Sequence, residues 1–162
     1  IGVLIEVPAA VYQARLLAKE ADFMAVGSND LTQYLLAVDR NNPRVADLYQ
    51  EVHPAVISAL REVARAAHAE EKPLGICGEL AGTPAGAILL MAMGYHVLSM
   101  DATHLLRVKW VIRNIKRSDA RRMLARVMRM DTAEEVTLFL NREMVRLGLS
   151  KVMPARSGKV AH

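Results

Sequence analysis

Short apolar runs alternate with longer amphipathic segments along this sequence, and the alternation constrains the fold more than any other feature. Apolar runs with the character of strands span residues 2–6, 23–27, 73–77 and 97–100. Helical patterns occupy residues 9–20, 31–37, 53–70 and 84–93 between and after these runs, and 105–115, 119–130 and 133–147 beyond them. Strands that alternate with helices are typical of an α/β fold with a parallel sheet. None of the runs alternates cleanly between apolar and polar residues, which predicts strands buried on both faces.

Length and composition narrow the class of protein. A chain of 162 residues, of which 52% are hydrophobic, is able to bury one core, and this excludes a disordered or fibrous protein. The single cysteine, Cys77, rules out an internal disulfide and fits a reducing compartment, so we expect a cytoplasmic protein. We expect no membrane partner, because no uncharged apolar run reaches about 18 residues. The chain starts at Ile1, inside an apolar run and without a methionine, and we expect it to be a piece of a longer polypeptide.

Charge is divided unevenly between the two parts of the chain. Residues 1–106 contain 7 Lys and Arg against 12 Asp and Glu, whereas residues 107–162 contain 14 against 5. A basic segment of this kind is able to bind nucleic acid. We favour a different interpretation, in which amphipathic helices pack their apolar sides inward and leave the basic sides in water, because only Trp110 interrupts the basic residues with an aromatic ring. We therefore expect no nucleic-acid partner. The basic residues concerned are Arg107, Lys109, Arg113, Lys116, Arg117, Arg121, Arg122, Arg126 and Arg129.

Polar side chains stand at the end of every predicted strand. Because the carboxyl ends of parallel strands meet at one edge of a sheet, we expect these side chains to form a site there. The residues are Glu6 after the first strand, Asn29 and Asp30 after the second, Cys77 and Glu79 at the third, and Asp101 after the fourth.

The segment Gly27 to Tyr34 (GSNDLTQY) is the most informative of these strand ends. A turn of small residues between a buried strand and a helix leaves backbone N–H groups free to bind an anion such as phosphate. Glu6 and Asp30 form a pair of hard oxygen ligands suited to Mg²⁺, which takes its remaining ligands from water and a substrate phosphate. No His or Cys spacing indicates zinc. An ordinary strand–turn–helix junction remains the alternative at this point.

Cys77 has two interpretations. A lone cysteine is usually a small, inert core residue. Its place at a strand end, with Gly75, Gly78 and Gly82 around it, favours a role in proton transfer or substrate contact.

Three segments resemble a known family. LIEVP around Glu6, GSNDLTQYLLAVDRNNPRVADLY over residues 27–49 and CGELAG over residues 77–82 are similar to the phosphoenolpyruvate-binding domain of enzyme I of the bacterial phosphotransferase systems. The segment GSNDLTQYLLAVDRNN is most similar to the nitrogen-regulatory branch. The resemblance runs from residue 1 to about residue 115, and more loosely to about residue 149. Pyruvate phosphate dikinase and phosphoenolpyruvate synthase share the Asn-Asp and Cys-Gly-Glu signatures, whereas the VDRNN segment distinguishes enzyme I.

The resemblance implies a fold. Residues 1–149 would be a partial phosphoenolpyruvate-binding domain that contains strands five to eight of a TIM-type (β/α)8 barrel, followed by extra C-terminal helices, with a flexible tail over residues 150–162. A half barrel leaves both sheet edges unpaired, so the parent polypeptide or another copy must complete it. Enzyme I is a dimer through this domain, which implies a homodimer.

The resemblance also implies an activity and a set of site residues. The whole enzyme would transfer the phosphoryl group of phosphoenolpyruvate to a histidine in a preceding domain, and then to a histidine carrier protein, with release of pyruvate. Glu6 and Asp30 match its magnesium ligands, Asn29 and Asp30 its phosphate-contacting pair, and Arg40 an arginine that binds phosphoenolpyruvate. Cys77 matches its general acid, and a thiol partly sheltered from water suits that role.

Several alternatives stay open at this stage. Arg40 could instead be a loop residue paired with Asp39 or Asp47, and Glu79 and Asp101 are expected only to orient the site. The chain could also be a dimerisation or regulatory module without catalytic activity. A third possibility is a fragment of a dikinase or synthase relative that uses ATP.

Overall fold

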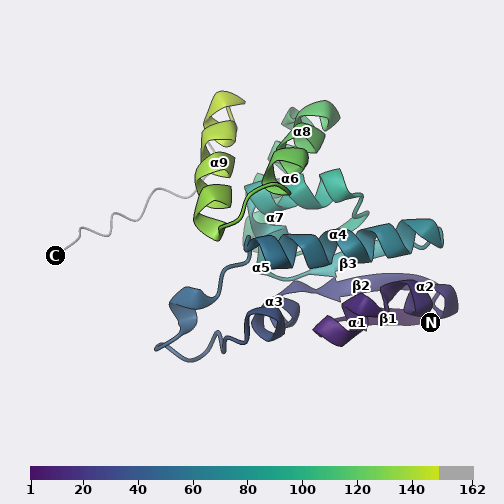
Figure 1. The fold of residues 1–162 in the computed structure, drawn as a ribbon. Coiled ribbons are helices and arrows are strands. Elements are labelled where there is room, and N and C mark those ends of the chain that lie inside the picture. Colours follow the sequence, from purple (N-terminus) through teal and green to yellow (C-terminus); the bar gives the residue numbers. More distant parts are fainter. Residues whose placement is uncertain (150–162) are drawn as a thin grey trace.

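The computed structural model describes residues 1–149, and a four-stranded parallel sheet with strand order β1-β2-β3-β4 lies at its centre (Figure 1). The strands are β1 (Gly2–Ile5), β2 (Phe23–Gly27), β3 (Leu74–Cys77) and β4 (Val97–Ser99). Each lies within one residue of a predicted strand, so the predicted α/β organisation with a parallel sheet is confirmed. The predicted tail, residues 150–162, lies outside the described residues.

Helices join the strands and continue beyond the last of them. They are α1 (Pro8–Tyr12), α2 (Ala14–Glu20), α3 (Ser28–Leu36), the 3₁₀ helix η1 (Ala46–Leu48), α4 (Pro54–Ala69), α5 (Glu79–Gly82), α6 (Pro84–Met93), α7 (Ala102–Asn114), α8 (Arg117–Val127) and α9 (Ala133–Arg146). In Figure 1, α8 and α9 stand above α6 at the end of the molecule farthest from β1.

Several helices differ from the sequence-based expectation. The helix predicted over residues 9–20 is divided at Gln13 into α1 and α2, although neither glycine nor proline marks the break. Helix α3 begins at Ser28, three residues before its predicted start, because β2 leads directly into it through Gly27. Helix α5 and helix η1 each form a single turn, which is too short to show a helical period in the sequence.

The two faces of the sheet have different environments, because successive side chains of a strand point to opposite sides. One face is buried beneath helices and carries Ile5, Met24, Val26, Leu74 and Ile76. The other, here called the open face, carries Gly2, Leu4, Phe23, Ala25, Gly75, Cys77, Val97 and Ser99. Leu4, Phe23 and Val97 are 48%, 50% and 58% exposed. The prediction that both faces are buried is therefore wrong for the described residues, since their own helices cover only one face.

Helix α4 illustrates why these segments form the elements that they do. The His53 side chain caps it by accepting a hydrogen bond from the Ala55 N–H at 3.1 Å, and Pro54 fits its first turn. Residues spaced three and four apart, Val56, Leu60, Val63 and Ala67, are buried in the core. Helix α4 follows the long connection from residue 37 to residue 53. The packing of α4 in the core therefore fixes where that connection ends.

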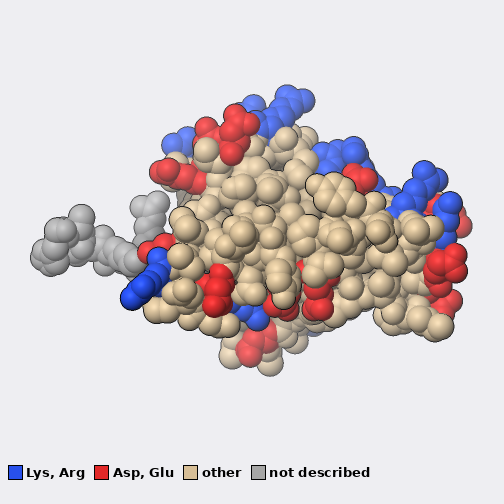
Figure 2. Space-filling view, turned by 60° about the horizontal axis from the view of Figure 1, so that its bottom comes forward, with Lys and Arg blue, Asp and Glu red and all other residues tan. Residues whose placement is uncertain are grey.

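The two helices α7 and α8 are amphipathic, as predicted. Their apolar sides are buried through Val108, Val111, Met123, Leu124 and Val127, whereas all nine of the basic residues identified in the sequence are exposed. The face in Figure 2 carries a broad uncharged area, with most charged side chains toward its margins. Every helix within residues 1–149 is too short or too polar to cross a bilayer.

Candidate active site

The strand register aligns the predicted site residues at the carboxyl edge of the sheet. Ile5 pairs with Val26, so Glu6 follows β1 beside Gly27. Gly27 pairs with Cys77, and Cys77 pairs with Ser99. Paired residues of parallel strands point to the same side, so these residues share the open face. We call the four of them, Glu6, Gly27, Cys77 and Ser99, the edge row.

The glycine in the edge row makes room for the carboxylate of Glu6. A Cβ atom at Gly27 would lie 2.4 Å from Glu6 Oε1 and 2.7 Å from Glu6 Cγ. The Glu6 side chain therefore extends across the end of β2, over the position that a side chain at Gly27 would fill. This places one carboxylate next to the turn into α3, where the second predicted metal ligand, Asp30, occupies the first helical turn.

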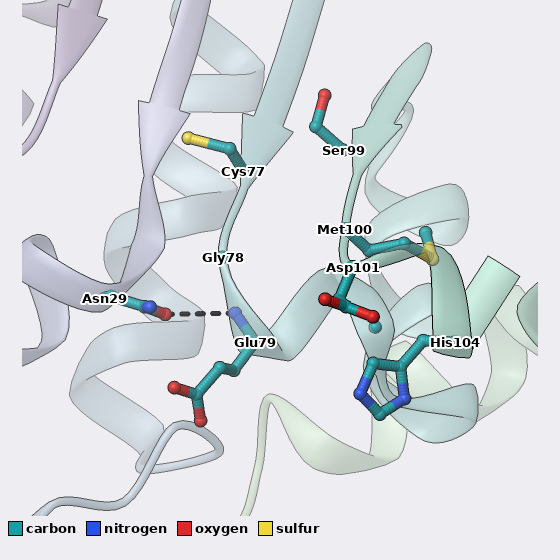
Figure 3. Close-up of a pocket in the computed structure, with 9 residues that line it drawn as sticks. Asn29, Cys77, Gly78, Glu79, Ser99, Met100, Asp101 and His104 are labelled. Carbon is teal, nitrogen blue, oxygen red and sulfur yellow. Dashed lines mark hydrogen bonds between the residues drawn. The ribbon is translucent and has the colours of Figure 1, made fainter.

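Asn29 is held from two directions. Its Oδ1 accepts a hydrogen bond from the Glu79 N–H at 3.0 Å (Figure 3), and its backbone carbonyl accepts one from the Tyr49 hydroxyl at 3.3 Å. Because the side-chain oxygen is occupied, the Asn29 amide NH2 remains as a donor. Within the described residues, no side chain caps the N-terminus of α3, so its first backbone N–H groups are also available to an anion.

Gly78 allows α5 and α3 to approach each other. It has a φ of 132°, and a Cβ atom there would lie 2.1 Å from Ser28 Oγ and 2.7 Å from Asn29 Oδ1. The Ser28 hydroxyl also donates to the Cys77 carbonyl at 3.0 Å. The turn after β2 and the turn after β3 are thus joined by direct contacts that a larger residue would break.

Arg40 reaches the site from the connection after α3. A guanidinium Nη lies 3.8 Å from Asp30 Oδ1, and the Arg40 backbone N–H donates to Gln33 Oε1 at 3.3 Å. The alternative partners considered for this arginine, Asp39 and Asp47, do not pair with it among the described residues. The ion pair is long and both side chains are about a third or more exposed, so its contribution to stability is small and the guanidinium remains free to bind a ligand.

Cys77 lies in the edge row with its thiol directed toward β2 (Figure 3). Its Sγ–H donates to the Val26 carbonyl at 3.6 Å. Cys77 is exposed in the described chain, because it projects from the open face, whereas the role of general acid that the resemblance implies suits a thiol partly sheltered from water. The hydrogen bond nevertheless fixes where the proton of the thiol is held.

A pocket of about 350 Å³ opens beside Cys77 and Asn29 (Figure 3). It is lined by Asn29, Cys77, Gly78, Glu79, Gly82, Ser99, Met100, Asp101 and His104. Glu6, Asp30 and Arg40 are not part of this lining. The predicted site residues therefore do not all line one pocket: Asn29 and Cys77 line it, whereas Glu6 lies over Gly27 and Asp30 stands in the first turn of α3.

Asp101 and His104 stand on the side of the pocket formed by α7. Asp101 accepts hydrogen bonds from the Thr103 hydroxyl at 2.6 Å and from the Thr103 N–H at 2.8 Å, which lower the pKa of Asp101 and cap the helix. His104 packs against Gly82, whose Cβ would lie 3.2 Å from the imidazole Cγ. The structure shows Asp101 as the cap of α7, and its expected role in orienting the site stays a prediction.

The connection after α3 brings a buried acid to the same edge. Glu51 Oε1 is buried without a hydrogen-bond partner among the described residues. Burial, followed by the negative charge of Glu79, raises the pKa of Glu51 to about 7. Burial and then the charge of Glu51 also raise the pKa of Tyr49, so this phenol remains a hydrogen-bond donor at neutral pH.

The donor set suits a small, hard cation only in part. Glu6 and Asp30 offer carboxylate oxygens, the ligands that Mg²⁺ prefers, and Mg²⁺ often takes only one or two carboxylates from a protein. Across residues 1–149, no three His, Cys, Asp or Glu side chains gather into a complete metal site. The arrangement therefore fits an ion that is also held by water and by a ligand.

A comparison with family models decides the classification. The model described as "PEP-utilising enzyme, PEP-binding domain" matches residues 1–117, which include every strand and all the site residues above. The chain belongs to this family. The family model ends at the first residue of α8, so the rest of α8 and all of α9 lie beyond it.

Several relatives of this phosphoenolpyruvate-binding domain are similar over most of the chain. The phosphoenolpyruvate-protein phosphotransferase of Haemophilus influenzae is 44% identical over 136 residues, which are 84% of this chain and 24% of that protein. The phosphoenolpyruvate-dependent phosphotransferase system protein of Escherichia coli is 42% identical over 149 residues, or 92% and 20%. The multiphosphoryl transfer protein of Xanthomonas campestris is 43% identical over 136 residues, or 84% and 16%. The chain thus spans about a quarter or less of these curated relatives.

Sequence reasoning did not single out some residues of the site. Tyr49 is the last residue of the segment 27–49 that carries the family resemblance, but sequence reasoning assigned it no role, and Glu51 lies just outside that segment. Ser28 lies inside the segment Gly27 to Tyr34, but the sequence does not show that its hydroxyl donates to the Cys77 carbonyl at the end of β3. His104 is exposed and lines the pocket, and its place there depends on the packing of α7 against α5.

Proposed function

We propose that this phosphoenolpyruvate-binding domain is part of a phosphoenolpyruvate-protein phosphotransferase, which passes the phosphoryl group of phosphoenolpyruvate to a histidine elsewhere in the enzyme and then to a histidine carrier protein. The observation that carries the proposal is the edge row, in which the Glu6 carboxylate and the Cys77 thiol flank Gly27. The proposed general acid, Cys77, and the proposed cation ligand, Glu6, would then act on either side of Gly27, beside the helix N-terminus that holds Asn29. The names of the relatives support the same activity.

We infer that the sheet is the half of a TIM-type barrel that contains strands five to eight. In such a barrel the face opposite the helices points inward, and the open face of this sheet carries large apolar side chains, including Leu4, Phe23 and Val97. Strands β1 and β4 are the edges of the sheet in the described chain. Further strands along these edges would bury both the edges and the open face. Residues 1–149 would then form one partial domain.

The binding of Mg²⁺ is assigned to Glu6 and Asp30. Their carboxylates would hold the ion at the carboxyl edge, where it would neutralise charge on a substrate phosphate. The fit rests on the position of Glu6 over Gly27 and on the place of Asp30 in the first turn of α3.

The binding of phosphoenolpyruvate is assigned to Asn29, Asp30 and Arg40. The Asn29 amide NH2 and the first N–H groups of α3, that of Asp30 included, would donate to phosphate oxygens. The Arg40 guanidinium would bind carboxylate or phosphate through two parallel N–H bonds. Phosphoryl transfer depends mostly on such positioning and electrostatic stabilisation, because charge spreads over the equatorial oxygens of the migrating group.

Cys77 is assigned the general acid. When the phosphorus–oxygen bond breaks, the enolate of pyruvate remains, and the Cys77 Sγ–H proton is transferred to its methylene carbon to give pyruvate. The thiolate then regains a proton from water. The bond from Sγ to the Val26 carbonyl holds the thiol at the edge row before the transfer. The exposure of Cys77 in the described chain would end once the rest of a barrel covered the open face.

The remaining parts of the proposal concern context. We propose a cytoplasmic enzyme that acts as a homodimer, on the resemblance to enzyme I, which is a dimer through this domain. We assign the chain to the nitrogen-regulatory branch on the resemblance of residues 27–42 alone. The sequence of the full-length gene tests this assignment, since a sensory domain ahead of the phosphohistidine region would support it and its absence would favour the sugar branch.

Calorimetric titration of the 162-residue chain with phosphoenolpyruvate in the presence of Mg²⁺ tests the function. Binding that is lost in Glu6→Ala and Arg40→Ala, but kept in Arg129→Ala between α8 and α9, would support the proposal. A folded chain that fails to bind would favour a dimerisation or regulatory module. Detection of an ATP-binding domain in the full-length gene would instead favour a relative of the dikinases.

A further inference from the structure

The connection from residue 37 to residue 53 carries the strongest observation that the proposed function does not use. This connection crosses the carboxyl edge of the sheet between α3 and α4 and brings the Tyr49 hydroxyl to the Asn29 carbonyl at 3.3 Å. Its start is tied to α3 by the bond from the Arg40 N–H to Gln33 Oε1, and its end is fixed by the capped start of α4 at His53. Tyr49 thus contacts Asn29 from a segment that is fixed at both ends.

We propose that Tyr49 is a positioning residue that fixes the orientation of the Asn29 side-chain amide toward the phosphate. This proposal rests on the proposed function, which assigns phosphate binding to Asn29. Asn29 stands in the first turn of α3, where the Tyr49 hydroxyl adds a hydrogen bond to its backbone carbonyl, and the Glu79 N–H occupies Asn29 Oδ1 at 3.0 Å. With its main chain and its oxygen both restrained, the amide has one direction left in which its NH2 group is able to donate.

The surroundings of Tyr49 keep its hydroxyl in the donating form. Burial raises the pKa of Tyr49, and the nearby Glu51 and Glu79 carboxylates act in the same direction, while the charge of Arg40 and a side-chain hydrogen bond with Arg40 oppose them. A neutral phenol donates one hydrogen bond, and the Asn29 carbonyl is the partner that the structure gives it. Substituting phenylalanine removes this donor and leaves the ring that packs in the connection.

The test compares Tyr49→Phe with a matched control in the 162-residue chain. Tyr95→Phe removes a tyrosine hydroxyl that donates to the Leu60 carbonyl at 3.0 Å, and that hydroxyl is buried in the core away from the site. Both variants lose one hydrogen bond from a tyrosine hydroxyl to a backbone carbonyl, so both should lower the free energy of unfolding. Only Tyr49→Phe should weaken phosphoenolpyruvate binding, and we expect a change of about three- to tenfold.

A double-mutant cycle with Asn29→Ala separates positioning from a general loss of structure. If Tyr49 acts through the Asn29 amide, Tyr49→Phe should leave phosphoenolpyruvate affinity nearly unchanged in the chain that already carries Asn29→Ala. Equal losses of affinity from Tyr49→Phe with and without the Asn29→Ala substitution would overturn the proposal.

A measurement without ligand keeps this inference distinct from the proposed function. In the ligand-free chain, Tyr49→Phe should move the NMR signals of the Asn29 side-chain NH2, and Tyr95→Phe should not. Unchanged Asn29 signals in Tyr49→Phe would overturn the proposal even if phosphoenolpyruvate binds. If the unmutated chain fails to bind phosphoenolpyruvate, the proposed function fails, and the Asn29 signals still decide whether Tyr49 fixes this amide.

Discussion

The substitution Gly27→Ala tests whether the Glu6 carboxylate functions where the structure places it. The new Cβ would lie 2.4 Å from Glu6 Oε1, whereas ordinary contacts of such an atom begin at 3.4 Å. The carboxylate must therefore move by about 1 Å or more, and displacements of that size in a site cost up to about 100-fold. We expect phosphoenolpyruvate binding in the presence of Mg²⁺ to weaken by about 10- to 100-fold, or about 1.4 to 2.7 kcal/mol.

The same substitution should not destabilise the fold. Gly27 has φ −88° and ψ 90°, which alanine also adopts, and the clashing atoms belong to the end of a flexible side chain. Alanine also restricts the unfolded chain, which adds about 0.4 to 1 kcal/mol of stability where the native conformation tolerates it. Binding and stability should therefore change in opposite directions.

Calorimetric titration and thermal unfolding of the 162-residue chain provide the assay. Gly75→Ala is the matched control, because it adds the same methyl group on the open face of β3 at an ordinary distance of 3.5 Å from Val97 Cβ. It should leave binding unchanged. The reasoning would be refuted if Gly27→Ala bound phosphoenolpyruvate as tightly as Gly75→Ala, or if it lost affinity only in proportion to a loss of folded protein.

Four further outcomes follow from the site. Gly78→Ala should both weaken binding and lower the free energy of unfolding by about 1 to 3 kcal/mol, measured by urea denaturation, because a positive φ and two close contacts oppose a side chain there. The pKa of Glu51 is raised from 4.5 to about 7 in the folded chain, so the folded state keeps a proton that the unfolded state loses. The free energy of unfolding of the unmutated chain should therefore fall, relative to that of Glu51→Gln, on the order of 3 kcal/mol as the pH rises from 4.5 to about 7. Equal pH dependence of the unfolding free energy in the two chains would contradict this. Arg40→Lys should weaken phosphoenolpyruvate binding by about tenfold in calorimetry, since a lysine lacks the two-pronged guanidinium. Cys77 should react readily with a thiol reagent because it is exposed, and phosphoenolpyruvate with Mg²⁺ should slow that reaction. An unchanged reaction rate under saturating ligand would argue against the place of Cys77 in the site.

Sequence reasoning located the elements of the sheet and most of the candidate site. The strand–helix alternation predicted a parallel sheet, and parallel strands bring their carboxyl ends together whatever the details of packing. For this reason Glu6, Asn29 and Cys77 were predicted to share one edge from the order of strands alone. Short elements such as α5 were missed because one helical turn has no period to detect.

What the sequence determined by itself was the order of strands and helices, the amphipathic C-terminal helices and the family, because these depend on local spacing and on short motifs. Only the tertiary structure decided that one sheet face stays open, that Arg40 pairs with Asp30, and that Tyr49 and Glu51 reach the site. These features depend on strand register and on a long connection whose path is set by contacts at its two ends. Contacts between residues far apart in the chain leave no periodic signal in the sequence, so they become visible only when the chain is folded.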